Sequence, residues 1–178
     1  KGISLDNSGN VYVAGKYYNG SVTYMLLQKF NAAGDLLWTD HYLPAGSTSA
    51  RASAVMVDGN GDVIITGANE NNNTGFTRKY DLNGQLLWSQ STTIRPFSMT
   101  LDETNNIYIT SWDFVNNPMQ IIKYDASGNL LWTASSTSVN GGAHGRIYYT
   151  NGFVYRTGGA TITISGKNVP VMYTRKYN

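Results

Sequence analysis

Residues 79–88 read KYDLNGQLLW, and this ten-residue phrase decides the fold because it recurs along the chain. It returns as KFNAAGDLLW at 29–38 and as KYDASGNLLW at 123–132, and another copy begins at 176–178. The copies start at residues 29, 79, 123 and 176, so the successive spacings are 50, 44 and 53 residues. Periods in this range are typical of repeat architectures, and the four-stranded β-propeller blade is the obvious candidate.

A second phrase keeps the same period. It reads DNSGNVYVAG at 6–15, DGNGDVIITG at 58–67 and DETNNIYITS at 102–111, with a degenerate copy, NGFVYRTG, at 151–158. The Asp, Asn and Gly residues that open each copy favour turns, and the β-branched and aromatic residues that follow favour strands. No segment shows an extended 3.6-residue apolar period, so we expect almost no helix. The sequence therefore predicts an all-β propeller whose blade repeats, each a four-stranded antiparallel sheet, span about 1–39, 50–90, 95–134 and 143–178.

The KYDLNGQLLW phrase itself predicts the last hairpin of a blade, with strand C, a tight turn and strand D. Asp81 and Gly84 suit the first and fourth positions of a type I turn, and a glycine in the left-handed region then gives a bulged hairpin. A tryptophan ends strand D in each full copy, where a large apolar side chain can fill the wedge between neighbouring blades. We expect Trp38, Trp88 and Trp132 to occupy equivalent, largely buried positions of this kind.

The fourth repeat departs from the pattern. Its turn between strands A and B is eroded, and the GxLLW segment that forms strand D in the other repeats is absent. The N-terminus does not supply that strand, because residues 1–5 already form strand A of the first repeat. The sequence therefore predicts an arc of a larger propeller, completed by the remaining blades of a longer chain or by a second copy, with a closed four-blade ring as the rival.

Composition excludes several classes of protein. Thirteen Lys and Arg against eleven Asp and Glu leave a net charge of +2, too small to suggest a nucleic-acid partner or an anionic membrane. Charged residues make up 13% of the chain, about half the ~25% of ordinary soluble domains. The chain has no cysteine, and no apolar run approaches the ~20 residues that span a bilayer.

The combined pattern DxxGNxYVxG…KYDxxGxLLW resembles the bacterial β-propeller repeat family called SBBP, and the resemblance covers essentially the whole chain. It is specific for blade architecture and says little about activity. Proteins of this family are typically secreted or attached to the cell surface, often within larger bacterial chains. The resemblance therefore implies an extracellular or surface location for this module.

Functional groups are expected on the face that carries the long, dissimilar connections, because binding residues concentrate in loops on a rigid scaffold. The predicted D–A links and B–C loops span 40–49, 90–96, 135–145, 16–23, 68–75, 112–118 and 160–168. Aromatic candidates in them are Tyr17, Tyr18 and Trp112, the last followed by Asp113. An exposed aromatic pair could stack on a sugar ring, whereas the alternative that we favour is packing over the neighbouring blade.

Two arginines are the polar candidates on this face. Arg51 and Arg95 each lie seven residues before a turn aspartate, so they should occupy equivalent places near the channel mouth. A carboxylate or sulfate ligand could bridge them. The alternative, which we favour, is a repeated hydrogen bond between blades. His144, in the segment GGAHG, is the best single candidate for a pocket residue, with a plain surface histidine as the alternative.

Neither metal binding nor catalysis has a convincing motif. Asp58, Asn60 and Asp62 supply the first three oxygens of a calcium loop, but its later ligand positions are missing, so turn capping is preferred. There is no zinc-protease, phosphate-loop, dinucleotide or serine-hydrolase signature. We therefore predict a module without cofactor or metal, not an enzyme, that binds a protein or carbohydrate ligand or acts as a spacer. The alternative is a carbohydrate-active or other hydrolytic propeller whose site lies on the loop face.

Overall fold

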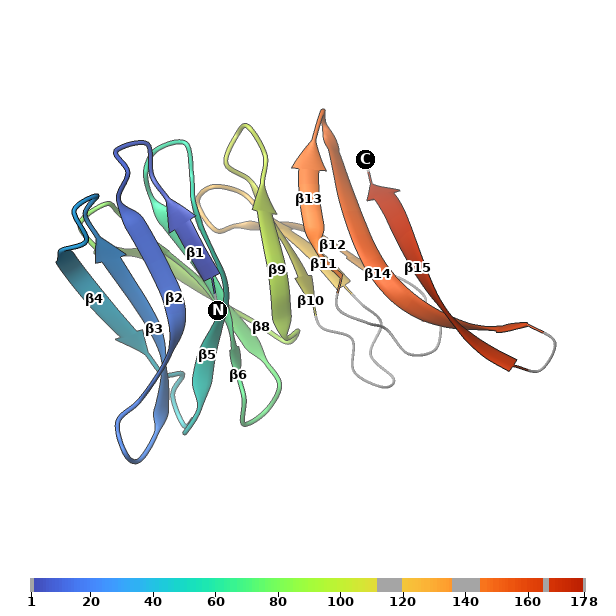
Figure 1. Ribbon diagram of the computed structural model, residues 1–178, viewed down its shortest axis with the longest axis horizontal. Helices are drawn as coiled ribbons and strands as arrows, with labels where there is room; N and C mark the ends of the chain where they lie inside the picture. The colour runs from blue at the N-terminus through green and yellow to red at the C-terminus, as the bar shows by residue number, and fades with distance from the viewer. Residues whose placement is uncertain (1, 112–119, 136–144, 165–166, 178) are drawn as a thin grey trace. The chain divides into compact units, whose positions relative to one another are not determined.

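The computed structural model describes residues 2–111, 120–135, 145–164 and 167–177, and every regular element in them is a β-strand (Figure 1). The strands form three four-stranded sheets and one three-stranded sheet, in which strands adjacent in sequence pair antiparallel. The chain divides into two compact units, residues 1–96 and 97–178, each with its own hydrophobic cluster. The predicted all-β blade architecture, with a last sheet that lacks strand D, is confirmed.

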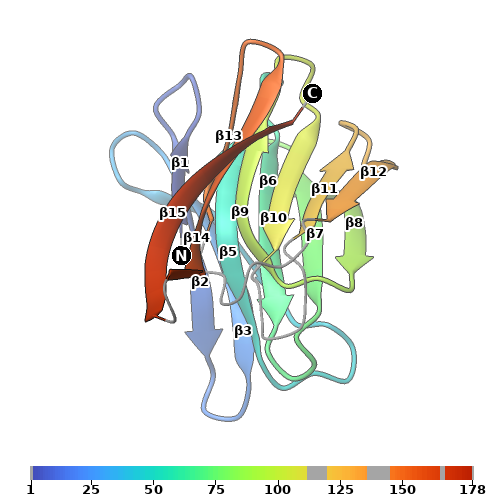
Figure 2. The same cartoon turned by 90° about the vertical axis from the view of Figure 1, so that its right-hand side faces the viewer.

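The first unit contains two complete sheets, of which Figure 2 shows β5 to β8 side by side. The first sheet consists of β1 (Gly2–Leu5), β2 (Val11–Tyr18), β3 (Thr23–Phe30) and β4 (Leu36–Tyr42). The second consists of β5 (Ala50–Val57), β6 (Val63–Asn69), β7 (Gly75–Tyr80) and β8 (Leu86–Thr92).

The second unit contains the third sheet and the three-stranded sheet. The third sheet consists of β9 (Pro96–Leu101), whose first residue belongs to the first unit, β10 (Ile107–Ser111), β11 (Gln120–Tyr124) and β12 (Leu130–Ser135). The last sheet consists of β13 (Ile147–Thr150), β14 (Phe153–Ile164) and β15 (Lys167–Tyr177).

The C–D hairpins have the predicted turn chemistry. In the second sheet, Asp81 Oδ1 accepts hydrogen bonds from the amides of Asn83 at 2.9 Å and Gln85 at 2.8 Å, which fixes the loop without help from other segments. Gly84 has a φ of +86°, a conformation that glycine adopts without steric cost, and the register shifts between Lys79 and Tyr80. The type I turn with its bulge is therefore confirmed, and the first and third sheets repeat the register shift.

The A–B turns have the same local design. Asp6 Oδ1 accepts from the amides of Ser8 and Asn10, both at 2.9 Å, and Asp58 and Asp102 cap their turns in the same manner. In the last sheet the turn shrinks to Asn151 and Gly152, both with positive φ. A two-residue turn of this kind suits a tight hairpin, so the predicted erosion of the fourth A–B turn is confirmed.

Trp38, Trp88 and Trp132 occupy equivalent positions, as predicted, and each is only partly exposed. Each lies in β4, β8 or β12, the edge strand of its sheet, so part of the indole stays in contact with water. Trp38 nevertheless occupies the predicted place between successive sheets of the first unit. Its Nε1 donates to the carbonyl of Leu82 at 3.3 Å, and the indole lies so close to Gly84 that a Cβ there would meet it at 2.9 Å.

The connections on the loop face are shorter than the sequence suggested. The predicted B–C loop at 160–168 is largely strand, because β14 continues to Ile164 and β15 begins at Lys167. These two strands pair along their whole length, far past the end of β13, as Figure 1 shows. The prediction failed because it relied on turn-forming residues, whereas long-range pairing carries the strands through them.

One connection of the first unit is packed tightly against a strand end. A Cβ on Gly75, the first residue of β7, would lie 2.1 Å from the ring of Pro96 and 2.6 Å from the carbonyl of Ile94. The link that follows β8 therefore crosses β7 at a distance that only glycine permits.

Candidate functional site

Tyr17 and Tyr18 are both exposed at the end of β2, but they do not act as a pair. Successive residues of a strand point to opposite faces of the sheet, so one tyrosine cannot join the other in a single stacking surface. Tyr18 is 62% exposed, and its hydroxyl donates to the carbonyl of Gly20 at 2.7 Å, which closes its own turn. The favoured expectation that both tyrosines pack over a neighbouring blade does not agree with their exposure, and the alternation of side chains along β2 excludes the alternative of a stacking pair.

Tyr17 instead belongs to a cluster with Tyr24 and His41, here called the Tyr17 cluster. Tyr17 and Tyr24 are cross-strand neighbours on β2 and β3, with ring centroids 6.4 Å apart. The His41 ring, on β4, lies 4.9 Å from that of Tyr17 and 6.2 Å from that of Tyr24. Tyr17 is 45% exposed and His41 is exposed, so the cluster presents ring surface to solvent instead of burying it.

Sequence reasoning missed two members of this cluster. His41 was placed in a link, whereas β4 extends through it to Tyr42 and puts the imidazole on the sheet. The sequence offered little signal, because residues 36–42 read LLWTDHY and show no regular apolar–polar alternation past the tryptophan. Three adjacent rings with hydroxyl and imidazole edges can stack on an apolar face and hydrogen-bond at its rim.

Arg51 and Arg95 meet at one carboxylate, that of Glu70. Arg51 Nε donates to Glu70 Oε1 at 2.9 Å, and Arg95 Nη2 donates to the same oxygen at 3.3 Å. Ser49 Oγ donates to Glu70 Oε2 at 3.0 Å, and Arg95 Nη1 donates to Asn73 Oδ1 at 3.0 Å. The two arginines are thus bridged by a carboxylate of the chain itself, in the place where a carboxylate or sulfate ligand was considered, and neither repeated phrase pointed to Glu70.

A shallow pocket of about 260 Å³ lies beside this cluster in the first unit. Its apolar wall is Tyr42 and Phe76, whose rings meet edge to face with centroids 4.9 Å apart. Thr74, Ser91 and Thr93 add hydroxyl groups. The guanidinium of Arg78 lies 3.9 Å from the centre of the Tyr42 ring and donates to the Tyr80 hydroxyl at 2.6 Å, which in turn donates to the Asp40 carboxylate.

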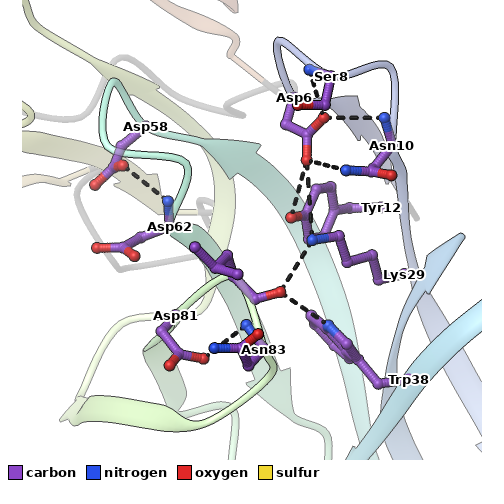
Figure 3. Close-up of polar contacts among 11 residues, drawn as sticks. Asp6, Ser8, Asn10, Tyr12, Lys29, Trp38, Asp58, Asp62, Asp81 and Asn83 are labelled. Atoms are coloured by element: carbon purple, nitrogen blue, oxygen red, sulfur yellow. Dashed lines mark hydrogen bonds and ion pairs between the residues drawn. The ribbon is translucent and has the colours of Figure 1, made fainter. Parts of the chain in front are cut away.

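A larger pocket, of about 360 Å³, lies at the opposite end of these two sheets, between their A–B turns (Figure 3). Its charged groups are already engaged. Asp6 Oδ2 accepts from Asn10 Nδ2 at 2.7 Å and from the Tyr12 hydroxyl at 3.3 Å, and Lys29 Nζ lies 3.9 Å from it. Lys29 also donates to the carbonyl of Leu82 at 2.9 Å. We therefore interpret this pocket as a structural joint between successive turns.

The protonation of these groups follows from their contacts. Burial raises the pKa of Asp6, but the hydrogen bonds from Asn10 and Ser8 and the charge of Lys29 outweigh burial and hold that pKa below its usual value. Burial and the neighbouring Asp6 carboxylate raise the pKa of Tyr12 to about 12. Both groups therefore keep their ordinary charge at neutral pH, and neither is prepared for proton transfer.

An ion pair between the two repeated phrases recurs in every complete sheet, and sequence reasoning missed it. The lysine that opens the C–D phrase approaches the aspartate that opens the A–B phrase: Lys29–Asp6 at 3.9 Å, Lys79–Asp58 at 2.7 Å and Lys123–Asp102 at 3.8 Å. Lys79 also lies 3.1 Å from Asp62. In the last sheet Asn151 replaces the aspartate, and Lys176 Nζ lies 3.3 Å from the centre of the Phe153 ring.

Three predicted site residues, Trp112, Asp113 and His144, lie outside the described residues. In the part of the chain that the structure describes, no group of three or more His, Asp or Glu side chains could hold a metal ion. The Asp58 carboxylate that suggested a calcium loop accepts from two turn amides and pairs with Lys79, as capping requires. Within the same residues, no helix has the length and apolarity needed to cross a bilayer.

No family model matches this sequence, and no curated protein does. Among solved structures, the β-propeller domain of the Trilobed protease from Pyrococcus furiosus is similar, with a TM-score of 0.63 and 9% identity over 98% of this chain and 54% of that one. BamB from Moraxella catarrhalis has a TM-score of 0.53 and 17% identity, over 94% of this chain and 51% of its own. An arabinanase from Bacillus subtilis has a TM-score of 0.55 and 11% identity, over 98% of this chain and 70% of its own.

These similarities establish the β-propeller fold. At such identities they establish the fold alone, since one propeller architecture serves many unrelated functions. The chain spans about half the length of that β-propeller domain and of BamB.

Proposed function

We propose that this chain is a non-catalytic, extracellular β-propeller module that binds a glycan through the Tyr17 cluster. The observation that carries the proposal is the exposure of adjacent aromatic rings, Tyr17 and His41, beside Tyr24 on one sheet face. Aromatic side chains usually bury their area, and a group of them left in solvent marks a surface that a ligand covers. Sugar rings suit it, because they combine an apolar face with hydroxyl edges.

The extracellular location is supported by the sequence. The repeat resembles the SBBP type, whose members are typically secreted or held at the bacterial surface. The scarcity of charged residues, 13% of the chain, agrees with that class of protein. Export of the protein to the medium or the cell surface, measured by fractionation of the producing cells, would support this part of the proposal.

A binding role is favoured over hydrolysis by the state of Glu70. A hydrolytic propeller needs two carboxylates that converge on the ligand, one as acid and one as base or nucleophile. Glu70 accepts hydrogen bonds at both oxygens, from Arg51, Arg95 and Ser49, so both of its oxygens are already engaged. The aromatic surface, by contrast, is open.

The test is affinity gel electrophoresis of the 178-residue chain in gels that contain one soluble polysaccharide each. We expect at least one neutral glycan to retard the protein, and Tyr17→Ala to weaken that retardation by roughly tenfold in Kd. Tyr18→Ala is the matched control, because Tyr18 is also exposed but faces the other side of the sheet.

Two results would contradict the proposal. One is equal retardation of the Tyr17→Ala variant and the unmodified chain in every gel. The other is release of reducing sugar from the retarding polysaccharide, which would assign the chain to the hydrolases instead.

A further inference from the structure

The Arg51–Glu70–Arg95 cluster carries one net positive charge, since two guanidinium groups face one carboxylate. Burial and the charge of Arg51 lower the pKa of Arg95, and Glu70 opposes that effect. Two like charges held this close repel each other, and an additional anion relieves that repulsion. The cluster is therefore electrostatically prepared for one more negative group.

The cluster is also accessible. The side chains of Arg51, Glu70 and Arg95 are 23%, 30% and 17% exposed, so a ligand group can approach without unfolding the loop. Arg51 uses Nε for Glu70, and its Nη1 has only a long contact, 3.5 Å, with Ser53 Oγ. A guanidinium offers five N–H donors, and among the described residues the Nη2 group of Arg51 has no acceptor.

A purely structural role for the arginines is less convincing, because Asn71 already fastens the adjoining link. Asn71 Oδ1 accepts from the amides of Thr48 at 2.9 Å and Ser49 at 3.0 Å, and its Nδ2 donates to Thr48 Oγ1 at 2.8 Å. The Glu70 amide adds a bond of 2.9 Å to the Ser49 carbonyl. The link thus has its hydrogen bonds without Arg51 or Arg95.

The cluster and the Tyr17 cluster lie at the same end of the first unit. The amide of Thr23, next to Tyr24, donates to the Thr48 carbonyl at 2.9 Å, and Ser49 in turn bonds to Glu70. Two such steps between extended segments, each about 4.8 Å, separate the backbones of Thr23 and Glu70 by roughly 10 Å. The two clusters nevertheless face opposite ways, because β2 turns Tyr12 and Ala14 toward the shared core, and β5 turns Ala50 and Ala52 toward it, so Tyr17 and Arg51 lie on outer faces.

We propose that Arg51 and Arg95 form an oxyanion site for the carboxylate or sulfate group of an acidic glycan, separate from the Tyr17 cluster. This inference rests on the proposed function and specifies its ligand class. Arginine suits the role because its planar fork matches two oxygens of a carboxylate or sulfate. Glu70 competes with the ligand for the same donors and positions them between binding events.

The experiment uses the same gels with four probes: polygalacturonate, its fully methyl-esterified form, chondroitin sulfate and a neutral galactan. We expect polygalacturonate or chondroitin sulfate to retard the chain more than the two uncharged polymers, and added salt to reduce the difference. The two acidic polymers separate a carboxylate ligand from a sulfate ligand. Arg51→Gln and Arg95→Gln should each weaken acidic retardation on the order of tenfold in Kd.

Two further variants separate a site from general charge and from misfolding. Glu70→Gln should strengthen acidic retardation, because the competing carboxylate is gone; a purely structural Glu70 would give no gain. Arg146→Gln removes the same charge from an exposed position in the other unit and should leave retardation unchanged. Melting temperatures of all variants, measured in parallel, show whether each is folded. The stronger acidic retardation expected of Glu70→Gln is a gain of binding, which a misfolded variant would not give.

Three outcomes would overturn the inference. If neutral galactan retards the chain in a Tyr17-dependent manner and the acidic polymers do no better, the oxyanion site fails while the proposed function stands. If no polysaccharide retards the chain, both fail. If poly-glutamate retards the chain through Arg51 and acidic polysaccharides do not, the site takes an acidic protein and not a glycan.

Discussion

Replacing Lys79 with methionine tests the view that the lysine between the two repeated phrases stabilises the sheet by neutralising buried carboxylates. The Lys79 side chain is 5% exposed and that of Asp58 is fully buried, with their charged atoms 2.7 Å apart, and Asp62 lies 3.1 Å from the same ammonium. Burial alone would lower the pKa of Lys79, but the hydrogen bonds that its ammonium donates to Asp58 and Asp62, together with the charges of both carboxylates, outweigh burial and raise that pKa. Methionine keeps most of the length of the side chain and removes its charge and its hydrogen-bond donors.

The expected cost is about 3–5 kcal/mol of unfolding free energy, the range for removing one partner of a buried pair. For a chain of this size, that corresponds to a fall in melting temperature of roughly 6–20 °C. The assay is thermal unfolding followed by circular dichroism.

A double-mutant cycle supplies the control. Asp58→Asn in the Lys79→Met background removes the orphaned charge and should recover part of the loss, whereas Asp58→Asn alone should be destabilising. A Lys79→Met variant that loses less than about 1 kcal/mol, as an exposed pair would, refutes the reasoning.

The remaining predictions concern packing and acid stability. Gly75→Ala should destabilise the first unit by about 1–3 kcal/mol, because the added Cβ would lie 2.1 Å from Pro96. Gly15→Ala, whose Cβ would meet no atom within 4 Å, should be nearly neutral in the same thermal melt. Trp38→Ala should lower the unfolding free energy by about 2 kcal/mol, less than a core truncation, because the indole is half-buried. Trp38→Phe should lower it less still, and a Trp38→Ala cost above that of a fully buried tryptophan would contradict this expectation. Burial raises the pKa of Asp102, but hydrogen bonds from Asn106, Thr104 and Tyr108 outweigh it and lower that pKa, so the stabilisation is present above about pH 3.8 and lost as pH falls through the folded value. Asp102→Asn should therefore flatten the acid limb of the melting profile, and Asp35→Asn, at an exposed turn, should not.

Local features were predictable from the sequence because their causes are local. The turn at Asp81 is closed by its own side chain, and Gly84 supplies the positive φ that the bulge needs, so a ten-residue window contains the whole explanation. The missing strand of the last sheet was predictable for the same reason, as the phrase that forms it elsewhere does not occur there.

The features that were not predicted depend on partners that are distant in sequence. Glu70 belongs to neither repeated phrase, so nothing marked it as the carboxylate that Arg51 and Arg95 share. The extent of β14 and β15 depends on their mutual pairing, which local turn propensity does not report. The lysine–aspartate pair could have been predicted, because the lysine recurs at a fixed place in one phrase and the aspartate at a fixed place in the other. The hairpin topology brings those two places together.

That ion pair has a consequence for how such a chain can grow. Each aspartate and its lysine belong to one sheet, so duplication of a single repeat copies both partners and leaves no charge stranded. The contact between successive sheets in the first unit requires no particular side chain on the adjacent sheet. Trp38 contacts the carbonyl of Leu82 and the backbone of Gly84, features that every copy of the turn provides. Extra blades can therefore be inserted by gene duplication without coordinated mutations at the joint, and a copy that loses its aspartate, as at Asn151, can still place its lysine over an aromatic ring.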